Sequence, residues 1–296
     1  MATTRMEKLH RLVEKSEKNN SFSGGLIVSE NDSVIYSAGI GYADIEKKVL
    51  NDTSTIFNIA SVGKLFTQIL ILQLLEREKL NLDDKLSKFF SSFNSDEMRD
   101  ITIFHLLDHR SGLDDVYVHP EYIAGVRNNI PNFQDQMVKL ISQEKLGFEP
   151  GEERSYSNSG YYLLGALASH IEGKSLADLM KERIFAVLDM NNSGSALNGD
   201  FVEGQAKPYK KNWLGKPKEV TITLPGDPPS GAGSQFASTA DLYRFYQSIL
   251  NDNRLLKDST KSLIFNHYKA MEFDSIKHSG WINGYVGGTI EDGVLK

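Results

Sequence analysis

The sequence predicts an α/β (α+β) fold in which an antiparallel sheet is flanked by helices and joined to a mainly helical region. Strand-like segments lie near both ends of the chain, the middle is mostly helical, and residues 204–233 hold too many prolines and glycines for a helix. A sheet built from both ends, with a helical region inserted, fits this order. We therefore expect a sheet region of residues 1–56 and 235–296, and a mainly helical region of residues 57–234 with a long loop at 204–233.

The first elements follow from the spacing of apolar residues. Residues 5–15 place apolar side chains at helical intervals, which predicts an amphipathic helix. Two apolar runs, 24–29 and 33–38, are separated by a polar turn, which predicts a β-hairpin. Apolar residues then recur every three or four positions, with no Pro or Gly after Gly63, so a long buried helix is expected to begin near Ser61.

Later elements are marked by their first residues. Ser175 and Ser238 each stand three positions before an aspartate and ahead of an apolar run, which predicts two helix starts of the capping-box type. Pro131 is expected to open another helix at its first position. Strand character returns only around residues 277–281 and 285–290.

The composition excludes several classes of protein. The chain has 296 residues, with 33 Lys+Arg against 39 Asp+Glu and a formal net charge of −6. This mild acidity argues against a nucleic-acid partner bound by phosphate neutralisation. The lack of cysteine excludes disulfide scaffolds and cysteine nucleophiles. No run of about 18 apolar residues occurs, so no transmembrane segment is expected, and the charged first residues do not resemble a signal peptide.

The first of three chemical motifs is Ser61 with Lys64. The two residues stand three positions apart at a helix start, where they share one face, and a desolvated lysine amine beside a serine hydroxyl can take its proton. The helix N-terminus adds free N–H groups for a developing oxyanion. The spacing alone is weak, because Ser142 and Lys145 repeat it at an expected solvated helix end.

The other two motifs lie much later in the chain. The phenol of Tyr156 can relay protons and the amide of Asn158 can donate to a carbonyl, although a loop anchor with Asn158 or Ser159 as a helix N-cap explains this tripeptide more simply. His278-Ser279-Gly280 stands in a strand-like setting. Its side chains can bind a carboxylate or a carbonyl, and its glycine allows a ligand to approach the strand edge.

The ordered combination is more specific than its parts. S-x-x-K at a helix start, Y-x-N about ninety residues later and [KH]-[ST]-G on a late strand form the three-element pattern of penicillin-recognising serine hydrolases. The chain resembles the serine β-lactamase-related family, which includes class C β-lactamases, D-Ala-D-Ala carboxypeptidases and esterases. The likeness covers roughly residues 20–290; its clearest segments are 57–61, 74–84, 101–113, 148–151, 156–165 and 233–245.

The resemblance implies a serine β-lactamase/transpeptidase-like fold and a set of catalytic residues. Ser61 matches the family nucleophile, Lys64 its proton-handling partner, and Tyr156 the general base or proton relay. Whether Lys64 or Tyr156 acts as the base stays open. The implied reaction is acylation of Ser61 followed by hydrolysis of the acyl-enzyme, with no metal and no organic cofactor.

The resemblance also implies a substrate-binding set. Asn158 matches the amide near the acyl group, and His278-Ser279-Gly280 matches the strand motif that recognises the substrate carboxylate. The N–H of Ser61 and that of Trp281 match the oxyanion hole. His replaces the lysine more common in β-lactamases, so carboxylate binding is expected to weaken above pH ~6.5. Expected substrates are small molecules or short peptides: esters, D-amino-acid peptides or amides, and β-lactams.

An alternative from another class is a non-catalytic, penicillin-recognising or truncated binding protein. Only sixteen residues follow Gly280, fewer than is usual in the family, and an incomplete sheet would disturb the oxyanion geometry. An uncovered sheet edge is also expected to favour self-association. The resemblance suggests a bacterial periplasmic or extracellular location, although the chain shows no signal peptide.

Two further groups have simpler explanations. His105 and His109 have the spacing of a zinc pair, but the base of H-E-x-x-H is absent, so a structural role is expected. Basic residues surround Tyr209 and Trp213, which is a pattern that can bind single strands. In an acidic chain this segment is expected to be a solvated loop, or one rim of the substrate cleft.

Overall fold

The computed structural model describes residues 5–19, 22–30, 32–197, 199–200, 202–220, 226–263, 290–291 and 294–295. The expected strand motif of His278, Ser279, Gly280 and Trp281 lies outside these residues. The same holds for the expected strand at 277–281 and for most of that at 285–290.

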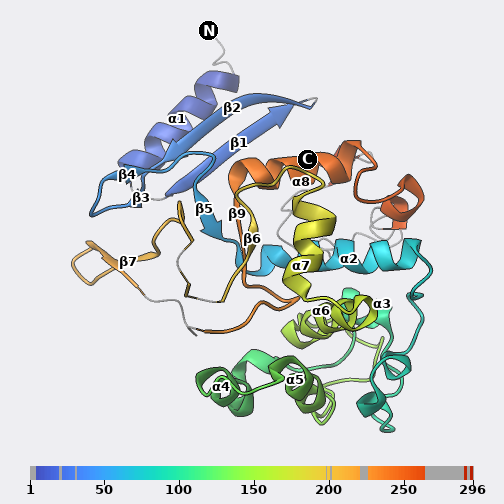
Figure 1. Ribbon diagram of the computed structural model, residues 1–296. Helices are drawn as coiled ribbons and strands as arrows, with labels where there is room; N and C mark the ends of the chain where they lie inside the picture. Colours follow the sequence, from blue (N-terminus) through green and yellow to red (C-terminus); the bar gives the residue numbers. More distant parts are fainter. Residues whose placement is uncertain are drawn as a thin grey trace.

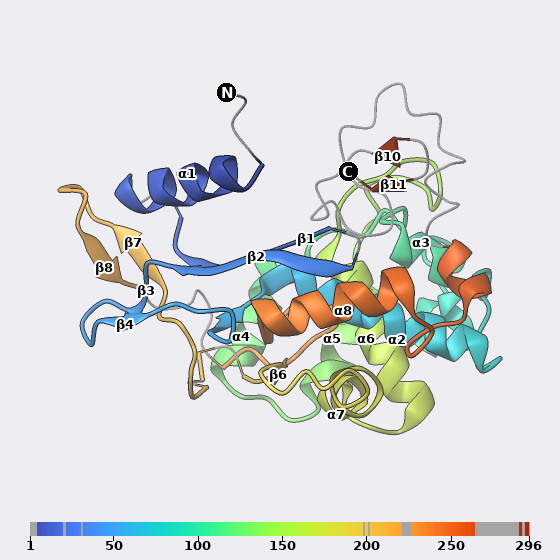
Figure 2. The same cartoon turned by 90° about the horizontal axis from the view of Figure 1, so that it is seen from above.

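The predicted N-terminal helix and hairpin are both present. Helix α1 (Arg5–Lys18) precedes β1 (Gly24–Glu30) and β2 (Ser33–Ile40), which pair antiparallel with Gly24 opposite Ile40 and an irregularity after Val28. Helix α1 packs against β2, whereas α8 (Thr239–Asn251) packs against β1, so the hairpin lies between the two helices (Figures 1 and 2). Segments from the two ends of the chain thus form one layered unit.

Short strands connect this unit to the rest of the molecule. Strands β3 (Tyr42–Asp44) and β4 (Val49–Leu50) pair with each other. Strand β9 (Gln235–Ser238) lies between β5 (Ile56–Asn58) and β6 (Gly194–Ser195), and both pairings are antiparallel. Strands β10 (Ile290–Glu291) and β11 (Val294–Leu295) form a further antiparallel pair. Because β5 pairs with β9, the residues ahead of Ser61 lie beside those that follow Gly233.

The long buried helix expected from Ser61 consists of two parts. A 3-10 turn, η1 (Ala60–Gly63), leads directly into α2 (Lys64–Glu76), most of whose side chains are buried. Helix α2 packs against α6 (Asn158–Glu172), which in turn packs against α3 (Ile103–Leu107). These helices hold the largest share of the hydrophobic core, and their packing fixes the relative positions of two of the three motifs.

Shorter helices complete the mainly helical region. They are η2 (Leu86–Lys88), η3 (Ser91–Phe93), η4 (Val116–Val118), α4 (Pro120–Arg127), α5 (Phe133–Ile141), α7 (Leu176–Met180) and the π-helical turn η5 (Lys181–Phe185). The predicted α+β class, with antiparallel strands and a mainly helical region, is confirmed.

The helix starts at Ser175 and Ser238 occur as predicted, but only half of each capping box forms. Each serine hydroxyl accepts from the N–H of the aspartate three residues later. The carboxylate of Asp241 is buried and binds elsewhere: it accepts from the N–H of Asn192 and from the hydroxyl of Ser193. An aspartate is one methylene shorter than the usual glutamate, and here a long-range contact replaces the reciprocal cap.

Two local predictions were wrong. Pro131 does not open a helix, because Asn132 after it is left-handed (φ 51°) and α5 begins only at Phe133. The expected loop at 204–233 contains an antiparallel hairpin of β7 (Tyr209–Lys211) and β8 (Pro217–Glu219). The Asn212 side chain accepts from two N–H groups of the turn, and Gly215 supplies its positive φ of 73°, so the turn residues close a hairpin.

Candidate active site

Ser61 lies in the turn that begins the buried helix. The N–H of Ile59 donates to the Gln235 carbonyl (3.0 Å), which ties this turn to β9. Ala60 is then left-handed (φ 45°), an unfavourable conformation for a residue with a Cβ. This strained bend directs the chain into η1 and places the Ser61 hydroxyl on the wall of the cleft described below.

Lys64 is completely buried directly below Ser61. Its Nζ lies 3.1 Å from Ser61 Oγ, 2.8 Å from Asn158 Oδ1 and 2.6 Å from the Ala232 carbonyl oxygen. The amide and carbonyl oxygens can only accept, so they take two N–H groups of the amine. The third tetrahedral position faces Ser61, where a neutral amine presents its lone pair.

The environment of Lys64 favours this neutral form. Burial lowers the pKa of Lys64 to about 7, although the nearby charge of Asp115 opposes the shift. At neutral pH a large fraction of the amine is therefore free to accept the proton of Ser61.

Tyr156 approaches Ser61 from the other side. Its phenol donates to Ser61 Oγ (2.7 Å), and its ring centroid lies 5.0 Å from Lys64 Nζ. His109 packs beside the ring at a centroid distance of 4.7 Å, and its Nδ1 accepts from the N–H of Ser157 (3.1 Å). His109, expected only to have a structural role, thus positions the loop that carries the phenol. His105 forms a capping box with Thr102.

Asn158 is the first residue of α6, and the N-cap is Ser157 rather than the expected Asn158 or Ser159. The Asn158 side chain is therefore available for the site. Its Nδ2 donates to Asp115 Oδ2 (2.8 Å), while Asp115 Oδ1 accepts from the N–H of Tyr117 (3.0 Å). Because a carboxylate can only accept, Asp115 fixes the Asn158 amide with its oxygen toward Lys64.

A cleft of about 890 Å³ opens beside Ser61. Its wall includes Tyr117 and Asp227. The cleft extends to Lys207 and to Tyr209, the first residue of β7, so this part of the expected loop forms a rim of the cleft. The Lys207 Nζ lies within 4 Å of three carboxylates: Asp44 (3.5 Å), Glu46 (3.7 Å) and Glu219 (2.9 Å). The hydrogen bond to Glu219 contributes most to raising the pKa of Lys207.

The structure therefore brings Ser61, Lys64, Tyr156 and Asn158 into one hydrogen-bonded group from two distant stretches of sequence. The four strand residues at 278–281 lie outside the described part. Sequence reasoning missed Asp115 and Ala232. Asp115 follows Leu113 by two positions, but nothing in the local sequence distinguishes it from other aspartates. The Ala232 contact is made by a backbone carbonyl, which every residue has, so the sequence cannot indicate it.

Among the described residues, no helix has the length and apolar character needed to cross a membrane.

Comparison with known proteins identifies relatives over most of the chain. A family model described as Beta-lactamase matches residues 9–286. The chain is 28% identical over 295 residues to penicillin-binding protein 4* of Bacillus subtilis (strain 168), which covers 95% of this chain and 64% of that protein. It is also 26% identical over 242 residues to teichoic acid D-alanine hydrolase of Staphylococcus aureus. That alignment covers 81% of this chain and 57% of the relative. The chain thus spans less than two thirds of the length of either relative.

A solved structure shares the fold. Superposition on the octameric penicillin-binding protein homologue from Pyrococcus abyssi gives a TM-score of 0.74 at 23% sequence identity, and covers 90% of this chain and 61% of that one. The predicted β-lactamase/transpeptidase-like fold is confirmed by this likeness.

Proposed function

The chain belongs to the β-lactamase family, and from this membership we propose that it is a serine hydrolase that forms an acyl-enzyme on Ser61. The observation that carries the proposal is the position of Ser61 Oγ between Lys64 Nζ (3.1 Å) and the Tyr156 phenol (2.7 Å). A hydroxyl with a neutral amine on one side and a proton donor on the other has both partners that acyl transfer requires.

We assign the proton transfers as follows. The Ser61 proton passes to the lone pair of neutral Lys64 as Oγ bonds to the acyl carbon, and the carbonyl π electrons move onto oxygen. The N–H of Ser61, at the start of η1, is one donor available to that oxyanion. When the carbon–leaving-group bond breaks, the Tyr156 phenol protonates the leaving group and regains a proton from Lys64. Water then repeats the sequence on the acyl-enzyme.

The proposed substrates are short esters and D-amino-acid esters or amides, with β-lactams as a further class. One relative is named a hydrolase of D-alanine on teichoic acid, and another a penicillin-binding protein. The cleft of about 890 Å³ is large enough for a short acyl donor, since ligand sites commonly measure about 300–1,000 Å³.

The decisive experiment is a burst assay with p-nitrophenyl acetate, followed by an intact mass measurement. We expect a burst of nitrophenol and a mass gain of one acetyl group in the wild type, and neither in Ser61→Ala. Ser142→Ala is the matched control, because Ser142 has the same spacing to a lysine but its hydroxyl donates to the Lys139 carbonyl (2.7 Å) and it does not line the cleft. Ser142 is buried (8% exposed) and not in the solvated position that the sequence predicted. The turnover of this variant should stay within about twofold of the wild type.

Two results would contradict the proposal. Turnover that persists in Ser61→Ala would place the nucleophile elsewhere. A folded wild type with no turnover and no adduct on esters, D-alanyl amides or a chromogenic cephalosporin would favour the alternative, a non-catalytic binding protein.

We also propose that the protein self-associates through an edge of its sheet. In the described part of the chain, β1 pairs only with β2, and exposed edges invite pairing with another chain. The homologue of the same fold from Pyrococcus abyssi is octameric. Size-exclusion chromatography with light scattering should give more than one chain mass, and a clean monomer at high protein concentration would refute this expectation.

A further inference from the structure

Asp227 is a buried carboxylate in the wall of the cleft that contains Ser61. The residue is 7% exposed, and its Oδ1 accepts from the phenol of Tyr122. Within the described part of the chain, no other hydrogen bond and no ion pair engages it. One hydroxyl does not replace the solvation that a buried carboxylate loses. Asp227 therefore keeps an oxygen available for a charged donor that enters the cleft.

Three tyrosine phenols lie near enough to this carboxylate to feel its charge. Its charge acts on the phenols of Tyr117, Tyr122 and Tyr162, which come from η4, α4 and α6. The Tyr117 and Tyr122 rings meet edge to face at 5.1 Å, and Tyr122 meets Tyr162 at 6.1 Å. Burial, assisted by the neighbouring charge, raises the pKa of all three phenols, so they remain neutral at ordinary pH. Of these three residues Tyr117 lines the cleft, whereas Tyr122 and Tyr162 are buried, so an ammonium group in the cleft would meet the carboxylate beside one aromatic side chain.

The charged residues that line the cleft also favour a ligand with an ammonium group. Among the described lining residues, only Lys207 and Asp227 are charged. Lys207 already lies within ion-pair distance of three carboxylates, so it offers little free positive charge to an anionic substrate. A purely structural role for Asp227 would explain its hydrogen bond to Tyr122. It would not explain why a carboxylate forms part of the cleft wall.

We propose that Asp227 binds the ammonium group of an acyl donor whose carbonyl carbon is attacked by Ser61. The substrate class is an aminoacyl ester or amide with a free amine, as opposed to an N-acylated or deaminated analogue. This inference rests on the proposed role of Ser61 and adds to it the group that selects the substrate.

The proposal predicts a pH window for selectivity. Burial raises the pKa of Asp227 to about 6, and an α-amino group loses its proton near pH ~7.7–8.0. Below the first value Asp227 is neutral, and above the second the amine is neutral. The preference for an aminated over a deaminated substrate should therefore be greatest between these values. Titration of Lys64 affects both substrates alike and cancels in the ratio.

The test compares the thioesters of D-alanine and of propionic acid with one thiol, since the two acyl groups differ only in the amine. We expect Asp227→Asn to lower kcat/KM for the D-alanyl thioester at least about tenfold, chiefly through KM, and to change the propionyl value less than about twofold. Glu182→Gln is the control, because it removes a half-exposed carboxylate that pairs with Lys174 and is not among the residues that line the cleft. It should leave the ratio of the two substrates unchanged.

The results that would contradict amine binding by Asp227 differ from those that would contradict the role of Ser61. An equal loss on both thioesters, or no loss on either, would show that Asp227 has no role in amine recognition and would overturn the inference while the role of Ser61 stands. Equal activity of Ser61→Ala and wild type on both thioesters would instead refute the proposed function. If Asp227→Asn does not fold, ethylamine should competitively inhibit propionyl thioester hydrolysis by the wild type, more strongly at pH ~7 than at pH ~5. No inhibition at either pH would overturn the inference.

Discussion

At the scale of single residues, the buried amine of Lys64 determines when the site can react. Its positive form has two acceptors, Asn158 Oδ1 and the Ala232 carbonyl, and no carboxylate of the described residues contacts it directly. Because burial lowers its pKa to about 7, the neutral form becomes the main one above that pH. A protonated amine cannot accept the Ser61 proton.

Activity should therefore increase with pH as Lys64 loses its proton. For p-nitrophenyl acetate, kcat/KM should rise about tenfold per pH unit below about 7 and level off above it. Lys64→Ala should remove most of the activity and the rise itself. A wild-type profile that falls with pH through neutrality would contradict the assignment of Lys64 as the base.

Asp115 acts on the same amine through Asn158. Its carboxylate sets the orientation of the amide and its charge raises the pKa of Lys64. Asp115→Asn removes the charge and also supplies an amide that can donate or accept, so Asn158 loses its orientation cue. We expect about a tenfold lower kcat, with the acidic limb of the profile moved to lower pH.

Asp114→Asn is the control for this prediction. Asp114 is exposed, and its carboxylate accepts from the N–H of Asp115 without touching Asn158. The acidic limb should not move in this variant. If both variants shift the limb equally, a general loss of negative charge explains the result and Asp115 is not a positioning residue.

The residues that sequence could identify are those whose side chains form a local pattern. Ser61 and Lys64 are one helical turn apart, so their spacing already implied a shared face. The contacts of Asp115 and Asp227 join residues 43 and 105 positions apart, and no local pattern encodes them. The Ala232 carbonyl belongs to the backbone, so only the folded chain could reveal it.

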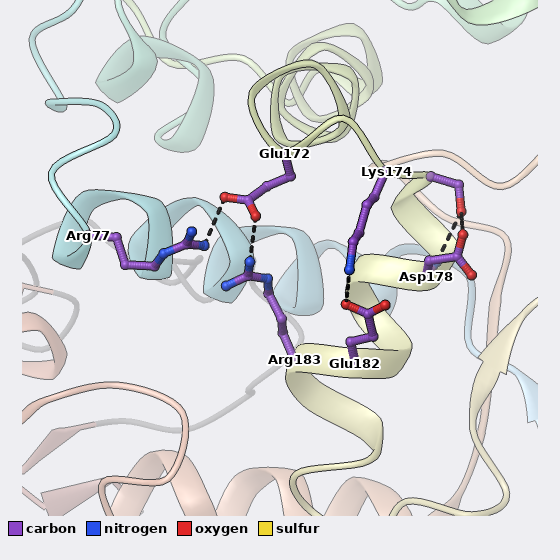
Figure 3. A network of polar contacts seen from close by, with 7 residues as sticks. Arg77, Glu172, Lys174, Asp178, Glu182 and Arg183 are labelled. Atoms are coloured by element: carbon purple, nitrogen blue, oxygen red, sulfur yellow. Dashed lines mark hydrogen bonds and ion pairs between the residues drawn. The ribbon is translucent and has the colours of Figure 1, made fainter.

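At the scale of elements, one carboxylate links the ends of two helices and a turn. Glu172, at the end of α6, accepts from Arg77 next to α2 (2.8 Å) and from Arg183 in η5 (2.5 Å), as Figure 3 shows. Its side chain is only 11% exposed. The nearby pair of Lys174 with Glu182 is about half exposed on both sides and is therefore well screened.

The difference in exposure predicts a difference in stability. Glu172→Gln should lower the free energy of unfolding by about 1–2 kcal/mol, since two charge-assisted hydrogen bonds weaken in a partly buried position. Glu182→Gln should change it by less than about 0.5 kcal/mol. Urea unfolding of both variants measures this, and equal effects would show that the Glu172 network adds nothing beyond a surface pair.

Element prediction succeeded where local chemistry decides the outcome. The serine N-caps of α7 and α8 formed because a hydroxyl and a nearby N–H need no distant partner. It failed at Pro131 and in the 204–233 segment, where the conformations of Asn132 and of the Asn212–Gly215 turn decided the structure. Positive φ at a non-glycine residue is not readable from hydrophobic spacing.

At the scale of the whole molecule, the site depends on how closely a loop approaches α6. The Gly231 backbone lies against Gly165, so a Cβ built on Gly165 would stand 2.7 Å from Gly231 N and Cα. The Thr67 hydroxyl also donates to the Gly231 carbonyl (2.8 Å). This contact holds Ala232 against Lys64, so α2, α6 and the loop are fastened to one another next to the site.

The last prediction tests this close approach. Gly165→Ala must push the loop away, because the obstacle is backbone and cannot rotate aside. We expect a loss of about 1–3 kcal/mol in stability and a fall of more than about tenfold in kcat, since Ala232 no longer meets Lys64 in the same geometry.

Gly147→Ala is the control: its φ is not positive and its new Cβ would meet the nearest atom at 3.7 Å, an ordinary contact. Thermal unfolding and burst kinetics on both variants measure the effect. Full activity in Gly165→Ala would mean that the loop position does not govern the amine at the centre of the site.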